Sequence, residues 1–96
     1  MKYSYVYILS NKNRTVFYTG VTADLSRRLA QHCAGNGSLF CKKYNVTTLV
    51  YYEMSTDIRC AIAREKQLKN WKREWKIILI KSKNPEMKDL MKKDFR

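Results

Sequence analysis

The chain has 96 residues, which is enough for one domain with a modest hydrophobic core. Its 20 lysines and arginines outnumber 8 acidic residues and give a net charge of +12, which attracts polyanions and favours nucleic acid over an acidic membrane surface as the partner. A hydrophobic fraction of 45% excludes an intrinsically disordered chain, and no apolar run approaches the about 20 residues of a membrane-spanning helix.

The start of the chain and its cysteines indicate a reduced, cytoplasmic protein. Met1 is followed by an alternating strand pattern and not by the apolar stretch of a signal peptide. Cys33, Cys41 and Cys60 form no CxxC pair, which is typical of idle thiols in a reducing compartment. A zinc site made of the three cysteines and His32 is an alternative, but it lacks the usual ligand-pair spacing.

The first 20 residues predict a β-hairpin. Residues 3–9 alternate in polarity and are rich in β-branched and aromatic residues, so their odd-numbered side chains, Tyr7 among them, share one face of a strand. A polar, turn-prone segment separates them from a second strand over residues 15–19, which contains Tyr18. Gly20 is expected to end this strand, because a residue without Cβ either adopts unusual dihedral angles freely or lets another backbone come close.

Three further elements are predicted between residues 24 and 53. Thr22 or Asp24 caps a helix over residues 24–32. A Gly-rich connection follows, which has no phosphate-loop pattern. The next elements are a short helical turn over residues 39–44, which carries Lys42 and Lys43, and a third strand over residues 46–53.

The second half predicts helices. Asp57 caps a long helix that ends at about Trp71, and a second helix covers about residues 72–81. Pro85 opens a last short helix over residues 86–93. Because no linker divides the chain, we expect a single domain over residues 1–96, with a core of about residues 3–81 and a C-terminal helical tail of about residues 85–94.

A helical wheel of the first helix separates two neighbouring arginines. Leu25 and Leu29 define the buried stripe, and His32 falls about 20° from Leu25. Arg28 lies on the same flank, one turn before His32, whereas Arg27 points away. Since burying an arginine without an anion is costly, Arg28 is expected to meet a carboxylate or a phosphate.

The long helix carries a carboxylate in an apolar stripe. The stripe consists of Ile58, Ala61, Ile62 and Leu68. Glu65 falls within about 5° of its centre, while Arg64 points elsewhere. A carboxylate in such a place needs a cation, so Glu65 is either the partner of an arginine or a metal ligand. One carboxylate with water and phosphate oxygens suits magnesium.

The tyrosines divide into two groups. Tyr3, Tyr44, Tyr51 and Tyr52 are expected to be core or cross-strand residues. Tyr7 and Tyr18 differ, because adjacent hairpin strands bring their rings together beside the helix that bears Arg28 and His32. A tyrosine acts as a general base only if its pKa of about 10 is lowered, which nearby cations or a metal would do.

A run of basic residues is interleaved with both tryptophans. It comprises Lys66, Lys69, Lys72, Arg73, Lys76, Lys81 and Lys83. The pattern is typical of a phosphate-binding face, and equally of a solvated basic helix. We expect Trp71 and Trp75 to pack inward on the sheet and the lysines to point outward and contact nucleic-acid backbone.

Four segments, taken in order, resemble the motifs of the GIY-YIG nuclease superfamily, in particular its small single-domain members. They are residues 5–7 (Tyr-Val-Tyr), residues 18–20 (Tyr-Thr-Gly), residues 24–32 with Asp24, Leu25, Arg28, Leu29 and His32, and residues 61–69 with Glu65. Each triplet alone is weak, but the ordered set is specific and covers nearly the whole chain. Tyr5 stands where glycine is usual, and Thr19 replaces isoleucine or valine. Val21 stands where some members have a basic residue just after the second motif. The phosphate contact of that basic residue is therefore either absent here or made by Lys42 or Lys43.

The resemblance implies an α+β fold, with a small three-stranded antiparallel sheet flanked by helices, and cleavage of phosphodiester bonds with one divalent metal. Tyr7 and Tyr18 become the paired hydroxyls, with Tyr7 favoured as the general base for the attacking water. Arg28 would hold the scissile phosphate and stabilise its charge. His32 would position or help deprotonate the water, and Glu65 would bind Mg²⁺ or Mn²⁺.

We therefore expect a monomeric, metal-dependent DNA endonuclease that acts on branched, nicked or single-stranded DNA in repair or recombination. The alternatives are a non-catalytic module that binds DNA or RNA, and an adaptor that needs a partner for activity. Because the chain has no room for a separate recognition domain, substrate preference would come from shape and backbone contacts and not from base reading.

Overall fold

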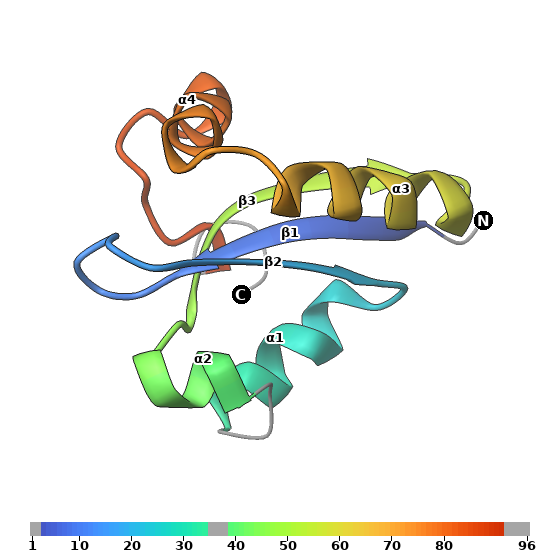
Figure 1. The fold of residues 1–96 in the computed structure, drawn as a ribbon. Helices are drawn as coiled ribbons and strands as arrows, with labels where there is room; N and C mark the ends of the chain where they lie inside the picture. Colours follow the sequence, from blue (N-terminus) through green and yellow to red (C-terminus); the bar gives the residue numbers. More distant parts are fainter. Residues whose placement is uncertain (1–2, 35–38, 92–96) are drawn as a thin grey trace.

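The computed structural model describes residues 3–34 and 39–91. Seven elements follow one another along the chain (Figure 1). They are β1 (Ser4–Ser10), β2 (Phe17–Thr22), α1 (Leu25–Cys33), α2 (Leu39–Tyr44), β3 (Thr48–Ser55), α3 (Ile58–Lys69) and α4 (Arg73–Lys83).

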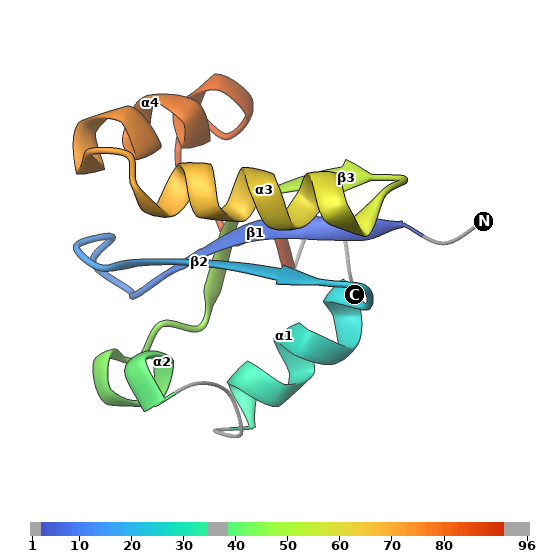
Figure 2. The same cartoon turned by 45° about the vertical axis from the view of Figure 1, so that its right-hand side comes forward.

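The three strands form one antiparallel sheet with helices on both faces. The strand order is β2-β1-β3, so β1 is central and β2 lies at an edge. The helices α1 and α2 lie on one face, and α3 and α4 lie on the other, as both views show (Figures 1 and 2). The predicted α+β class and three-stranded antiparallel sheet are confirmed. No helix within residues 3–34 and 39–91 has the length and apolarity that crossing a bilayer requires.

Both long helices that follow a strand begin where an aspartate caps them. The Asp24 side chain accepts a hydrogen bond from the backbone N–H of Arg27 at 3.1 Å and starts α1. The Asp57 side chain accepts one from the N–H of Arg59 at 2.9 Å and starts α3. Each bond satisfies a donor that has no partner within its helix, which confirms the two predicted N-caps.

Alternation along β1 places hydrophobic core on each side of the sheet. On the α1 side, the buried cluster consists of Tyr7, Leu9, Leu25, Leu29, Cys41, Val46 and Leu49. On the other side, Val6 packs with Ala61 and Leu68 of α3, and Ile8 packs in a cluster with Ile80 of α4. The helices α1 and α3 are therefore fixed on opposite faces of the same hairpin.

The second strand begins later and ends later than the sequence predicts. Asn11 Oδ1 accepts hydrogen bonds from the backbone N–H groups of Thr15 at 2.8 Å and Val16 at 3.2 Å. These bonds hold the two residues in the connection, so β2 starts at Phe17. The prediction that Gly20 ends the strand is wrong, because Gly20 pairs with Tyr7 within the ladder.

The exposed face of α3 is rotated relative to the predicted one. Ile58 and Ile62 are exposed, although the wheel places them in the buried stripe. Arg64, predicted to point away, is half-buried because its guanidinium binds both carboxylate oxygens of Glu53 on β3 at 3.0 to 3.2 Å. This ion pair joins α3 to β3, while Ala61 and Leu68 are on the buried side of the helix.

Several aromatic residues lie nearer the surface than predicted. Trp71 is partly buried against the Val6 cluster, but Trp75 is exposed on the outer side of α4. Tyr51 is buried and Tyr52 half-buried, as expected. Tyr3, just before β1, and Tyr44, which contacts Phe40 with ring centroids 4.9 Å apart at the end of α2, are exposed. The core assignment is therefore wrong for Tyr3, Tyr44 and Trp75.

The last predicted helix begins later than expected. Residues 85–86 form a turn, residues 87–89 are irregular, and helical structure is present at residues 90–91; residues 92–93 lie outside the described part. Asn84 explains the difference, because its side chain bonds both backbone groups of Lys88 and competes with a helix there. Met87 accordingly adopts a positive φ of 50°.

Asn84→Ala is expected to lower the free energy of unfolding by about 2 kcal/mol. The buried Asn84 amide donates to the carbonyl oxygen of Val50 at 3.0 Å and to that of Lys88 at 2.8 Å, and loss of a buried partner costs about 1–3 kcal/mol. Urea unfolding followed by circular dichroism measures the change. Asn70→Ala, at an exposed residue, is the matched control, and equal stability of the two variants would contradict the prediction.

Candidate active site

The hairpin brings Tyr7 and Tyr18 together on the α1 face of the sheet. Tyr7 pairs with Gly20, and Tyr18 pairs with Leu9, so the two rings are diagonal neighbours. Their centroids are 6.4 Å apart. Tyr7 is fully buried, whereas Tyr18 is half-buried. The predicted proximity of the two tyrosines is thus present.

Gly20 leaves the space that the Tyr7 ring occupies. A Cβ atom at Gly20 would lie 2.5 Å from both Cζ and Oη of Tyr7, a distance that non-bonded atoms do not reach. The requirement for glycine comes from this side chain and not from the end of a strand. With no Cβ at Gly20, the Tyr7 phenol crosses over the β2 backbone toward α1.

Helix α1 adds a histidine and an arginine to the tyrosine pair. His32 is buried, and its Nε2 lies 3.4 Å from Tyr7 Oη. The imidazole centroid is 6.2 Å from that of Tyr7 and 5.9 Å from that of Tyr18. Arg28 is half-buried and Arg27 is exposed, as the helical wheel predicts.

Burial keeps both hydrogen-bonded groups neutral at pH 7. Loss of solvent, followed by repulsion from Tyr18, raises the pKa of Tyr7 to about 12, although the positive charge of Arg28 opposes the rise. Burial, and then the charge of Arg28, lowers the pKa of His32 below its ordinary value. The Tyr7 phenol therefore retains its proton at pH 7.

The His32 ring has one nitrogen with no hydrogen-bond partner among the described residues. This atom is Nδ1, which is buried. If Nε2 accepts a proton from Tyr7, the neutral imidazole must carry its own proton on Nδ1. In this arrangement the Tyr7 hydroxyl donates the hydrogen bond and Nε2 of His32 accepts it.

Glu65 lies on α3, which packs on the face of the sheet opposite α1 (Figure 1). Its side chain is 15% exposed, and its carboxylate pairs with Lys69 Nζ, one helical turn on, at 3.2 Å. Lys69 Nζ in turn lies 5.9 Å from the ring centroid of Tyr18. The Lys69 side chain thus links α3 to Tyr18 on the edge strand β2. The internal partner of Glu65 is thus a lysine, and the arginine alternative is wrong.

The donor set around Glu65 suits a hard cation better than zinc. Within residues 3–34 and 39–91, no three His, Cys, Asp or Glu side chains gather into a metal-binding group. Cys33 and Cys60 are exposed and Cys41 is buried in the core. One mostly enclosed carboxylate that already holds an ammonium group fits an ion whose other ligands are water and phosphate oxygens.

The predicted nucleic-acid contacts fall into two groups. Lys66, Lys69, Lys72, Arg73 and Lys76 come from α3 and the start of α4, whereas Lys42 and Lys43 come from α2 on the other face (Figure 1). The Arg73 guanidinium lies over Phe17 of β2 at 5.6 Å. Lys76 lies beside Phe17 and Arg73, and burial, followed by repulsion from Lys69, lowers its pKa; Lys69, Arg73 and Lys76 therefore gather beside β2.

One aromatic residue near the candidate site was missed from the sequence. Phe40 of α2 lies with its ring centroid 6.1 Å from that of Tyr18 and is exposed. It precedes Lys42 and Lys43 in a short helix, and an exposed aromatic residue beside basic ones is typical of nucleic-acid contacts. The position of Phe40 two and three residues before Lys42 and Lys43 is the feature of the sequence that could have identified it.

The thermal stability of the protein is expected to fall as pH drops below 6.5, and less steeply in His32→Gln. Because the folded pKa of His32 is lowered, the unfolded chain binds the proton first, so this contribution to stability is complete above pH 6.5 and is lost below it. Melting temperatures of both proteins across the acid range measure the effect. Carboxylates titrate equally in both, so parallel curves would contradict the shift.

Comparisons with known proteins give matches over most of the chain. Residues 3–78 match the family described as the GIY-YIG catalytic domain. A UPF0213 protein of Syntrophus aciditrophicus is 38% identical over 90% of this chain and 98% of its own length. One of Staphylococcus haemolyticus is 35% identical over 82% of this chain and 95% of its own. The solution NMR structure of the Bacillus halodurans UPF0213 protein BH0048 covers 98% of this chain and 99% of its own, with a TM-score of 0.59 and 28% identity.

The family match covers most of the chain and contains every residue of the tyrosine, arginine, histidine and glutamate cluster. Together with relatives that match over nearly their full lengths, it assigns the chain plainly: this small protein belongs to the GIY-YIG superfamily of nuclease domains.

Proposed function

We propose that the chain is a divalent-metal-dependent endonuclease that hydrolyses phosphodiester bonds in DNA. The observation that supports this most is the convergence of Tyr7, Tyr18, Arg28 and His32 on one face of the hairpin, with Glu65 linked to Tyr18 through Lys69. A cation, a proton acceptor and a carboxylate beside an edge strand supply the groups that hydrolysis of a phosphodiester needs.

Arg28 binds the scissile phosphate. Its side chain is half-buried on the flank of α1 that faces the two tyrosines, and its charge acts on both Tyr7 and His32. A guanidinium in a partly enclosed site matches two phosphate oxygens and stabilises the charge that develops on them. Arg27 is exposed and has no part in the reaction.

Tyr7 and His32 move the proton of the attacking water together. As the water attacks, its proton passes to Tyr7 Oη while the Tyr7 proton passes to Nε2 of His32, 3.4 Å away. Tyr7 therefore never needs to exist as a free tyrosinate, which its raised pKa of about 12 disfavours. His32, whose pKa is lowered, is neutral and able to accept the proton.

Glu65 would hold the cation, and the Lys69 ammonium group would then leave the Glu65 carboxylate. When bound there, Mg²⁺ or Mn²⁺ would polarise the phosphate and stabilise the leaving oxygen. Lys69 lies beside Tyr18 of β2, so once it had left Glu65 it would be placed to contact the DNA backbone.

The substrate is DNA with a branched, nicked or single-stranded region, as found in repair and recombination. Its backbone lies along the basic residues of α3 and α4, with a second contact at Lys42 and Lys43. These contacts address phosphates and carry no sequence information directly, so the structure of the DNA determines where it is cut.

Arg28→Ala is expected to lower the cleavage rate by about 100-fold or more, and Arg27→Ala to leave it nearly unchanged. The two arginines are adjacent and equal in charge, so the comparison separates phosphate stabilisation from the general field of the protein. Labelled single-stranded, flapped, nicked and duplex DNA, with Mg²⁺ or Mn²⁺, provide the assay.

A non-catalytic module that binds DNA or RNA is the second candidate. The raised pKa of Tyr7 and the pairing of Glu65 with Lys69 favour it, because both make the resting site unreactive. If the wild-type chain binds but cuts none of the substrates, or if Arg28→Ala cuts as fast as Arg27→Ala, the endonuclease assignment fails and the binding module stands.

A further inference from the structure

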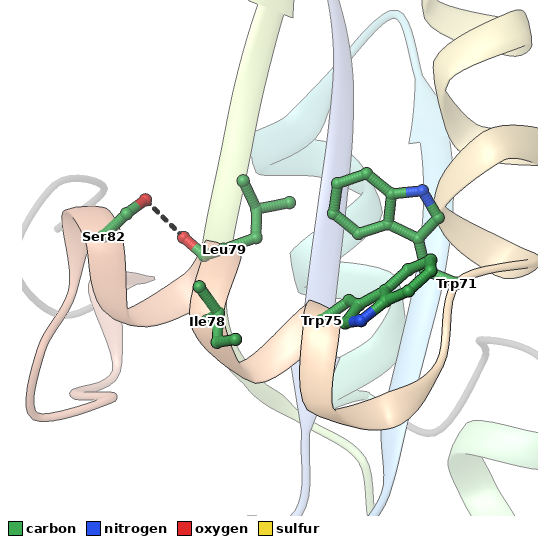
Figure 3. A pocket seen from close by; sticks show the side chains of 5 residues that line it. All are labelled: Trp71, Trp75, Ile78, Leu79 and Ser82. Atoms are coloured by element: carbon green, nitrogen blue, oxygen red, sulfur yellow. Dashed lines mark hydrogen bonds between the residues drawn. The ribbon is translucent and has the colours of Figure 1, made fainter.

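The outer side of α4 carries an open apolar groove that the candidate active site does not use. It is lined by Trp71, Trp75, Ile78, Leu79 and Ser82 and has a volume of about 340 Å³ (Figure 3). Trp75 is 51% exposed and Ile78 is 67% exposed. Large apolar side chains grouped on the surface of a soluble domain mark an interaction site.

The groove exists because α4 is apolar on two sides. Ile80 is buried, and Ile77 is partly buried, in the core beneath the helix. Trp75, Ile78 and Ser82 follow one another at helical spacing on the other side, away from the sheet. Trp71 and Leu79 at the base of the groove pack against the Val6 cluster, whereas Trp75 and Ile78 are exposed and belong to none of the core clusters of the described residues.

The shape of the groove suits a flat ring. The indoles of Trp71 and Trp75 are 6.1 Å apart and nearly perpendicular, at 86°. They form a corner, visible in Figure 3, in which a planar group stacks on one indole while its edge meets the other. Ile78 continues the apolar surface at the open end.

The charge around the groove selects the occupant. Lys72 Nζ lies 5.9 Å from the Trp75 ring centroid. The Arg64 guanidinium lies 5.3 Å from the Trp71 centroid, but its charge is balanced by Glu53, so Lys72 is the cation at the groove that favours an anion. Two copies of a chain with a net charge of +12 would bring their Lys72 side chains together at such a contact, which is unfavourable. A polyanion that also carries flat apolar rings complements both the charge and the indoles.

We propose that the Trp71–Trp75 groove binds an unpaired nucleobase of single-stranded nucleic acid, with Lys72 on the adjoining phosphate. The inference rests on the proposed function only in taking nucleic acid as the ligand. Paired bases are not available for stacking, so the groove favours single-stranded segments and accepts any base. It gives this small domain a means of recognising unpaired DNA structure without reading sequence.

Tryptophan fluorescence tests the groove directly, because Trp71 and Trp75 are the two tryptophans of the chain. A single-stranded oligonucleotide is expected to quench this emission as the bases stack. An abasic deoxyribose-phosphate oligomer of equal length carries the same charges but no bases, so it is expected to bind without comparable quenching. Titrations in metal-free buffer keep cleavage out of the measurement.

Trp75→Ala is expected to weaken binding of a labelled single-stranded oligonucleotide about tenfold, whereas Trp75→Phe retains most of the affinity. The salt dependence of binding should not change, since no phosphate contact is lost. Met54→Ala, at an exposed apolar residue of β3, is the matched control. Circular dichroism confirms that each variant is folded.

Equal quenching by the abasic oligomer, or equal affinity of Trp75→Ala and the wild type, would overturn the inference. Self-association without nucleic acid that Trp75→Ala abolishes, measured by sedimentation, would assign the groove to a second copy instead. The two proposals fail separately. Quenching without cleavage of any substrate would support base binding in the groove and contradict the endonuclease assignment. Cleavage without quenching would support the endonuclease assignment and contradict base binding in the groove.

Discussion

Replacing Glu65 with glutamine is expected to lower the cleavage rate by about a thousandfold while the protein remains folded. The change removes the charge that would hold the cation but keeps the size of the side chain. A bound cation contributes several kcal/mol to stabilising the transition state of phosphoryl transfer, and each 1.36 kcal/mol is tenfold in rate. Single-turnover cleavage with saturating Mn²⁺ measures the loss.

Stability is expected to change little in Glu65→Gln, because its pair with Lys69 is a partly exposed pair one turn apart on one helix. Such pairs contribute about 0.5 kcal/mol or less. Glu86→Gln, which removes a carboxylate from an exposed pair with Lys88, is the matched control and should cut normally. Calorimetric titration with Mn²⁺ supplies a readout apart from activity, in which only Glu65→Gln loses binding.

The prediction fails if Glu65→Gln cuts as fast as Glu86→Gln, or if both bind Mn²⁺ as the wild type does. Lys69→Met gives a further check. Removing the ammonium that occupies the Glu65 carboxylate is expected to strengthen Mn²⁺ binding, even though the cleavage rate falls with the lost backbone contact. Weaker Mn²⁺ binding in this variant would place the cation elsewhere.

The elements and the local arrangement of α1 were predictable because short-range chemistry determines them. Two aspartate caps set the starts of α1 and α3, and alternation along β1 set the two faces of the sheet. The distinction between Arg27 and Arg28 needed only the helical period and two leucines. The roles of these residues in the reaction stay predictions.

What the sequence did not predict depends on contacts between distant segments. The pairing of Arg64 with Glu53 joins α3 to β3 and places an arginine that was predicted to point away in a half-buried position, whereas Ile58 and Ile62 are exposed. The Asn84 side chain bonds Val50 and Lys88 and displaces the expected start of the last helix. A periodic pattern within one segment gives no information on which residue of another segment its side chains contact.

The candidate site shows the same limit. The wheel placed Glu65 on a buried side but could not identify Lys69 as its partner. Proximity of cations suggested a lowered pKa for Tyr7, whereas burial, which follows from the whole fold, raises it. The outward position of Trp75 likewise depends on which side of α4 meets the sheet, and two apolar sides made that choice ambiguous.

Gly20→Ala is expected to lower the free energy of unfolding by about 2 kcal/mol or more and to impair cleavage at the same time. The added methyl group would lie 2.5 Å from Cζ and Oη of Tyr7, so the ring must move. Tyr7 is fully buried, with His32 in contact on the far side, and overpacking a core of this kind costs about 1–3 kcal/mol. Elsewhere in a strand, the same substitution usually stabilises by reducing the freedom of the unfolded chain.

A double-mutant cycle with Tyr7→Leu separates the clash from a general effect of alanine. Leucine removes the ring atoms that the methyl group meets, so the cost of Gly20→Ala should largely disappear in the Tyr7→Leu background. Melting temperature is the measurement, since about 2 kcal/mol corresponds to roughly 10 °C in a domain of this size. If Gly20→Ala costs the same free energy in both backgrounds, glycine is required for its backbone conformation. If the cost is confined to the background with Tyr7, glycine is required because its missing side chain leaves the space that places the Tyr7 hydroxyl beside His32.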